Sequence, residues 1–182
     1  MKLPKWPSDG WFIFEHYGPK AWIRWAKKHH RMSKRQKAVN FCREALKYKG
    51  QMVYVEYGER YGQTRSSLFH RRPGDFRGAG ADCSQFVSSI MHWCGVKNVT
   101  DQDATGSLLA KGRVAKDPAI ARLVIFGPGS GRHVGMLTEK KNGVWYLVEF
   151  GMQSAPDKVS LPAASDYFRR RGIYGVRIRD FF

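Results

Sequence analysis

One cysteine of the sequence stands where a thiol can become a nucleophile. Cys83 opens the segment 83–94, whose apolar residues recur at spacings of three and four, as on a helix with one buried face. The free N–H groups and the dipole of a first helical turn favour an anion, and Asp82 can cap that turn. Cys83 is therefore placed to react as a thiolate if a base lies nearby. The alternative is a small buried apolar side chain, the common fate of a free cysteine.

His133 is the base that the sequence offers. It begins the apolar run 133–138, which indicates a strand. A histidine can take the proton of the thiol when an amide carbonyl is attacked and return a proton to the leaving amine. The alternative is an ordinary histidine at the end of a strand. The other histidines lack a comparable setting: His16, His29, His30, His70 and His92.

The helices that must position this pair come early in the chain. Ser33 is a candidate N-cap for a helix over 34–48, which Gly50 would end, and Gly95 would end the helix over 83–94. A long loop is expected over 50–81, between these helices. A polar connection is expected to follow over 97–121.

The second half of the chain has the pattern of strands. Asn142-Gly143 is a strong signal for a tight hairpin between two of them. We therefore expect an α+β fold in which the helices come first and an antiparallel sheet of four to six strands follows. The expected strands are 123–126, 133–138, 144–150 and 173–179.

Charge is the unusual feature of the composition. The 182 residues hold 32 Lys and Arg against 15 Asp and Glu, a net charge of +17. This predicts a polyanionic neighbour such as nucleic acid, anionic lipid or the polymers of a bacterial wall. Residues 1–50 hold 13 basic and 3 acidic residues. We expect a basic, aromatic helical arm over 1–35 and one domain over 36–182.

Other classes are disfavoured by the same composition. Hydrophobic residues make up 42% of the chain, unlike a disordered protein, yet no stretch approaches the ~18 apolar residues of a membrane span. The three cysteines form neither a disulfide scaffold nor a C-x-x-C pair, so no metal site and no cofactor are expected. No apolar segment follows the first lysines, which predicts synthesis in the cytoplasm without a signal peptide.

The motifs at the two candidate residues resemble those of the NlpC/P60 family of papain-like cysteine peptidases. The sequence DCSQFV at 82–87 is similar to the family's D-C-S-G-hydrophobic motif, and HVG at 133–135 to its H-V-G/A motif. Gln85 replaces the usual glycine. The strand at 123–126 is similar to the family's D-L-V-x-F strand, but Arg122 stands where an acidic residue is usual.

The resemblance extends to the peptidase domains of bacteriophage endolysins. The segments at 54–60, 105–112 and 149–156 are similar to three further endolysin segments and occur in the same order. Together the pieces cover about residues 40–160. The resemblance implies a papain-like fold, with the catalytic helix packed on a small antiparallel sheet.

The resemblance also implies an activity and its catalytic residues. The family hydrolyses peptidoglycan, commonly at the stem-peptide bond between D-glutamate and a diamino acid. Cys83 would be the nucleophile and His133 the general base and acid. A third polar residue orients the histidine; Glu149, in a strand, is preferred to Gln153. A tyrosine upstream of the cysteine would help to stabilise the oxyanion, with Tyr54 preferred to Tyr57.

Further residues near the pair are candidates for substrate binding. Asp82 and Ser84 flank the nucleophile, and Gln153 follows the strand of Glu149. Arg132 lies next to the candidate histidine, and we expect it to meet a carboxylate of the substrate. The partner would be bacterial peptidoglycan, with electrostatic contact between the basic arm and anionic wall polymers.

Three functions remain open at this point. A phage lysin that reaches the wall through a holin, or is carried in the virion, accounts for both the motifs and the charge. A nucleic-acid-binding protein accounts for the charge and the interleaved aromatic residues, but the sequence shows no helix-turn-helix, zinc-finger or RNP pattern. A Cys–His amidase or acyltransferase acting on another amide is the third. The order of cysteine before histidine favours hydrolysis over acyl transfer.

Overall fold

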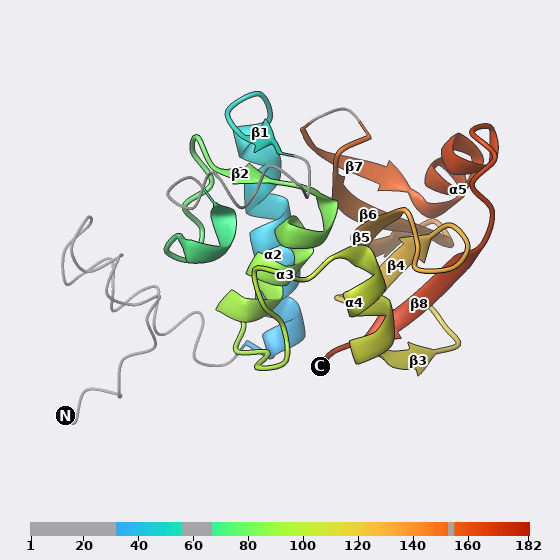
Figure 1. Ribbon diagram of the computed structural model, residues 1–182, viewed down its shortest axis with the longest axis horizontal. Coiled ribbons are helices and arrows are strands. Elements are labelled where there is room, and N and C mark those ends of the chain that lie inside the picture. The colour runs from blue at the N-terminus through green and yellow to red at the C-terminus, as the bar shows by residue number, and fades with distance from the viewer. Residues whose placement is uncertain (1–31, 56–66, 153–154) are drawn as a thin grey trace.

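The computed structural model describes residues 32–55, 67–152 and 155–182 as an α+β fold (Figure 1). Most of the predicted arm, together with Tyr57 and Gln153, lies outside these residues. The helices are α2 (Lys34–Ala45), α3 (Cys83–Trp93), α4 (Thr105–Lys111) and α5 (Leu161–Arg169), with 3-10 turns η1 (Leu46–Tyr48) and η3 (Leu68–His70). The strands are β1 (Val53–Tyr54), β2 (Gly80–Ala81), β3 (Arg113–Ala115), β4 (Leu123–Phe126), β5 (His133–Lys141), β6 (Val144–Phe150), β7 (Pro156–Ser160) and β8 (Val176–Asp180).

The described strands β3 to β8 form one antiparallel sheet in the order β3-β8-β4-β5-β6-β7, and β1 and β2 form a small parallel pair. Side chains of a strand alternate between the two faces of its sheet. In β4, Leu123 and Ile125 belong to the core cluster shared with α2 and α3, whereas Val124 and Phe126 pack with Ala164 and Phe168 of α5. The sheet therefore lies between the pair α2 and α3 on one face and α5 on the other (Figure 1).

Helix α3 lies at the centre of the larger core cluster. Its predicted apolar stripe is buried, but Ser84, Gln85, Ser88 and Ser89 are buried as well. The expectation of a single buried face was therefore wrong. Small and polar residues on the other face let α2, η3 and the β1–β2 pair pack closely around the helix.

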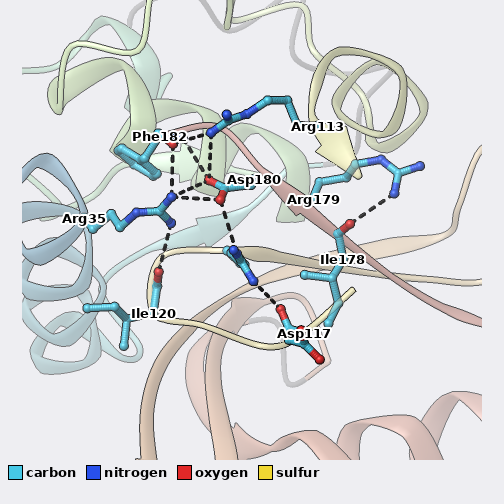
Figure 2. A network of polar contacts seen from close by, with 9 residues as sticks. Arg35, Arg113, Asp117, Ile120, Ile178, Arg179, Asp180 and Phe182 are labelled. Carbon is cyan, nitrogen blue, oxygen red and sulfur yellow. Dashed lines mark hydrogen bonds and ion pairs between the residues drawn. The ribbon is translucent and has the colours of Figure 1, made fainter. Parts of the chain in front are cut away.

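An ionic cluster around the buried Asp180 joins the start of α2 to the end of the chain (Figure 2). The Arg35 guanidinium lies 2.8 Å from both Asp180 oxygens, and Arg122 lies 3.2 Å from one of them. Burial by itself would raise the pKa of Asp180, but hydrogen bonds from Arg35, the Phe182 backbone N–H and Arg122 outweigh it and lower that pKa. Arg122, which stands where an acidic residue was expected by resemblance, thus has its acidic partner on β8.

The structure confirms the predicted local signals where the pattern was strong. Ser33 caps α2 by accepting a hydrogen bond from the Gln36 backbone N–H, and β4 and β6 have the predicted bounds. Asn142 and Gly143 both have positive φ, as the tight hairpin turn requires. The six strands of the sheet agree with the upper end of the predicted range.

Other predictions were wrong. The helices do not all precede the sheet, because α5 lies between β7 and β8. The polar connection 97–121 contains α4 and β3, and the loop 50–81 contains β1, η3 and β2. The last strand begins at Val176 instead of 173. No helix of the described ranges is long and apolar enough to cross a membrane.

Candidate active site

The nucleophile candidate Cys83 is the first residue of α3 and is buried, with 6% of its surface exposed. Asp82 caps the helix: its Oδ1 accepts hydrogen bonds from the Gln85 backbone N–H and the Ser84 hydroxyl, each at 2.8 Å. These contacts fix the backbone at the first turn, where helix N–H groups favour an anion. The Cys83 side chain is therefore held at the N-terminal end of α3 by a capped first turn.

The parallel pair β1–β2 brings Tyr54 next to this helix start. Tyr54 pairs with Ala81, two residues before Cys83, and the Val55 N–H donates to the Ala81 carbonyl at 3.1 Å. Its ring packs edge-to-face on Phe150, with 5.5 Å between ring centroids. Tyr54 therefore lies between the start of α3 and the end of β6.

His133 and Glu149 meet at the end of the sheet where β5 begins and β6 ends. The register pairs Gly135 with Glu149, and the alternation of side chains places Glu149 and His133 on the α5 face. The Nε2 atom of His133 lies 2.8 Å from Oε2 of Glu149, which also accepts the Met152 backbone N–H at 3.1 Å. The carboxylate therefore accepts the Nε2 proton and leaves Nδ1 as the ring nitrogen that can serve Cys83.

The His133 imidazole interacts with both the thiol and the carboxylate. Burial disfavours its charged form and by itself lowers the pKa. The charge of Cys83 and a side-chain hydrogen bond to Cys83, followed by the hydrogen bond and charge of Glu149, outweigh burial and raise the pKa of His133 to about 10. The imidazolium is therefore the favoured form of His133 at neutral pH.

Glu149 is the most deeply buried of the three, with 1% of its surface exposed. The sequence predicts that a carboxylate in so apolar a strand needs a partner, and His133 is that partner. Its other oxygen, Oε1, has no hydrogen-bond partner among the described residues. Among the described residues, the hydrogen bonds to the carboxylate come from His133 and the Met152 backbone N–H, both at Oε2.

The predicted substrate-binding residues lie in different settings. Asp82 and Ser84 are buried and hydrogen-bonded to each other, so they support the first turn of α3. Arg132 is exposed, and its backbone N–H donates to the Phe126 carbonyl at 2.7 Å, directly before His133. Gln153 lies outside the described residues. Contact of these residues with a substrate stays a prediction.

Sequence reasoning missed two residues that support the site. The Gln85 side chain donates to the Ser67 hydroxyl at 3.0 Å, and Ser67 forms a parallel bridge with Gly80 beside β1 and β2. The departure from the family glycine at 85 was the available signal, but the sequence did not reveal its partner. Phe168 of α5 packs on His133, and no sequence pattern connects these two residues.

The remaining cysteines differ from Cys83. Cys42 and Cys94 are buried in the core and form no disulfide, and burial raises the pKa of Cys42 well above its usual range. A thiol with so high a pKa, as at Cys42, is a poor nucleophile. Among the described residues no group of three or more His, Cys, Asp or Glu side chains is arranged to hold a metal ion.

The chain matches no protein-family model and no curated protein. The resemblance to NlpC/P60 peptidases stays a prediction from the motifs at 82–87 and 133–135 and from the further segments. In the structure His133 interacts with Cys83 and with Glu149, and the three residues come from α3, β5 and β6.

Proposed function

We propose that this chain is a papain-like cysteine peptidase of the NlpC/P60 type that hydrolyses stem-peptide amide bonds of peptidoglycan. The observation that carries the proposal is the position of His133, which interacts with Cys83 on one side and with Glu149 at 2.8 Å on the other. A nucleophile, a base and an orienting carboxylate in this relation are the components that amide hydrolysis through a thiol requires.

The geometry supports a two-step reaction. The Cys83 thiolate adds to the amide carbonyl, and the His133 imidazolium gives its Nδ1 proton to the leaving amine, so that a thioester forms as the C–N bond breaks. His133 then takes a proton from water, whose oxygen attacks the thioester; the C–S bond breaks, a carboxylic acid is released, and the Cys83 thiolate and the His133 imidazolium are restored. The Glu149 carboxylate accepts the hydrogen bond from the Nε2–H group throughout, which fixes the His133 ring in one orientation.

The oxyanion of each tetrahedral intermediate needs hydrogen-bond donors at the helix start. The Cys83 backbone N–H lies in the first turn of α3 and is one candidate. Tyr54 is the other, because β1 carries it beside Ala81. This pairing gives the small parallel sheet a role in positioning a catalytic hydroxyl.

The proposed substrate follows from charge and from the resemblance. Peptidoglycan stems carry carboxylates within an anionic wall, and a net charge of +17 favours association with such a polymer. The resemblance to endolysin peptidase domains favours a phage lysin that acts at the wall on the bond between D-glutamate and a diamino acid. Arg132, exposed next to His133, is the proposed contact for a stem carboxylate.

A digest of purified peptidoglycan tests this function. Wild type, Cys83→Ala and Cys94→Ala are incubated with several wall chemotypes, and the released fragments are weighed by mass spectrometry. We expect wild type and Cys94→Ala to create the same new amine termini and Cys83→Ala to create none. Equal release by Cys83→Ala would remove the thiol mechanism.

Two other outcomes identify the alternatives. If the acyl group is found joined to another nucleophile and not released as a carboxylic acid, the site belongs to a transferase that uses the same Cys–His pair. If no chemotype is cleaved by wild type, the peptidase proposal fails. Salt-dependent binding of a nucleic acid would then favour the binding-protein hypothesis.

A further inference from the structure

Two phenylalanine rings enclose the His133 imidazole on the α5 face of the sheet. The ring centroid of Phe168 lies 5.0 Å from that of His133 at an interplanar angle of 33°, and the centroid of Phe126 lies 6.3 Å away. The two phenylalanines stack on each other at 4.8 Å. We call Phe126 and Phe168 the phenylalanine wall.

The fold fixes the phenylalanine wall from two separate elements. Phe126 ends β4 and pairs with His133 in the β4–β5 register, so its position follows from the sheet. Phe168 comes from α5, which Ser160 caps and which buries Ala164 and Phe168 against β6 and β7. Helix α5 thus brings an aromatic side chain from 35 residues along the chain onto the imidazole.

The wall packs on the imidazole on which the proposed chemistry depends, and that imidazole and its carboxylate partner are both buried. His133 is 6% exposed and Glu149 is 1% exposed, while Phe126 and Phe168 are 1% and 6% exposed. A hydrogen bond between charged groups is stronger where water is excluded, and a ring packed between neighbours cannot turn away from its partner. The wall therefore acts on the same contact in two ways: it lowers the local polarity and restricts rotation of the ring.

We propose that Phe168 is a positioning residue that keeps water from the His133–Glu149 hydrogen bond and holds the imidazole in the orientation that presents Nδ1 to Cys83. The proposal rests on the proposed function for its catalytic meaning, but the cover itself is a property of the folded chain. Phe168 does not touch the reacting atoms in this account; it acts through His133.

Exchange of the His133 Nε2 proton with water, observed by NMR on the 15N-labelled full chain, tests this proposal without a substrate. In wild type the shielded proton is expected to give a sharp imidazole N–H resonance. Phe168→Ala removes the ring that packs on His133, so the Nε2–H resonance of His133 is expected to broaden beyond detection in this variant. Phe168→Leu keeps an apolar side chain but loses the ring, and its exchange is expected to be about tenfold faster than in wild type.

Val124→Ala is the matched control, because Val124 is fully buried in the same core cluster and lies on β4. It removes apolar volume without removing the wall, so the resonance is expected to stay sharp. An unchanged resonance in Phe168→Leu would overturn the proposal, whether or not Phe168→Ala folds. Equal loss of the resonance in Val124→Ala would also overturn it, since the protection would then come from general packing.

Turnover separates this proposal from the proposed function. If wild type digests peptidoglycan, Phe168→Leu is expected to lower kcat while KM stays within about twofold, because Phe168 acts on the base and not on substrate binding. If no wall is digested but exchange changes as described, the proposed function fails while the role of Phe168 as cover remains. If digestion is normal in Phe168→Leu and exchange is unchanged, only the role of Phe168 is lost.

Discussion

Replacing Glu149 by glutamine tests how the base is held. The carboxylate accepts the His133 Nε2 proton at 2.8 Å and a backbone N–H from Met152 at 3.1 Å. A glutamine carbonyl can accept the same proton, so Glu149→Gln keeps the side-chain length and the acceptor for Nε2, while it removes the negative charge and puts an amide NH2 in place of Oε1. The variant therefore separates the electrostatic contribution of Glu149 from its contribution to geometry.

The expected loss follows from the strength of the hydrogen bond. A hydrogen bond to a charged group contributes about 1.5–3 kcal/mol and a neutral one about 0.5–1.5 kcal/mol, so removal of the charge costs about 1–1.5 kcal/mol. If that difference appears in the transition state, kcat falls about tenfold. Glu149→Ala also removes the acceptor and lets the ring turn, so it is expected to lose more.

The reasoning also predicts in which direction Glu149→Gln moves the pH dependence of the rate. In wild type the carboxylate helps to raise the pKa of His133 to about 10, so the imidazolium form is lost only as the pH rises through that value. Without the charge of Glu149 the pKa of His133 falls, and the alkaline limb of the rate profile moves to lower pH. The profile is measured as peptidoglycan turnover and, independently, as the rate of Cys83 alkylation.

Gln153→Ala is the control for the other candidate from the sequence. Because Glu149 already occupies Nε2 of His133, this variant is expected to keep the wild-type kcat and the wild-type alkaline limb. The reasoning is refuted if Glu149→Gln is folded and active with an unchanged profile. It is also refuted if Gln153→Ala shows the larger loss.

Three further predictions concern the support of the site. Asp180→Asn is expected to lower the free energy of unfolding by about 2 kcal/mol at pH 7, since Arg35 loses its charged partner. Because the pKa of Asp180 is lowered in the fold, this difference from wild type should be full above about pH 4 and should vanish as the pH falls further. A difference in unfolding free energy that is independent of pH in denaturant titrations would contradict this. Gln85→Ala leaves the buried Ser67 hydroxyl without its partner and should cost about 1–2 kcal/mol in the same assay, whereas an unchanged midpoint would show that the 3.0 Å hydrogen bond contributes nothing. Gly151 has φ +136°, and a Cβ there would lie 2.7 Å from the Tyr54 ring. Gly151→Ala should therefore displace the Tyr54 ring and lower kcat. If the effect runs through the Tyr54 hydroxyl, Gly151→Ala should cause no further loss of kcat in a Tyr54→Phe background, and a further loss would contradict it.

Local sequence signals predicted the elements that carry the proposed nucleophile and base. The stripe from Cys83 to Cys94 required a buried helix, and Asn142-Gly143 required a hairpin that sets β5 beside β6. That pairing is what places Glu149 near His133. The contact was predicted through resemblance, and a lone carboxylate in an apolar strand was the physical reason to expect it.

Elements with short or mixed patterns could not be predicted in this way. Strand β3 is three residues long and α4 seven, so neither has enough positions to show a period. Strand β7 begins at Pro156, is largely polar and, among the described strands, pairs with β6 alone. Helix α5 was missed although Ser160 as N-cap and Pro162 in the first turn are local signals of its start. The contact between Phe168 and His133 could not be predicted, because packing between distant segments leaves no local signal.

Titration of the thiol against wall digestion tests the central claim most directly. Wild type is treated with increasing iodoacetamide at neutral pH, the alkylated cysteine is located by mass spectrometry of peptides, and the remaining peptidoglycan turnover is measured in the same samples. The account predicts that Cys83 alone reacts under conditions that spare Cys42 and Cys94, and that turnover falls in proportion to its modification. Full turnover by a chain that is completely alkylated at Cys83 would contradict the account.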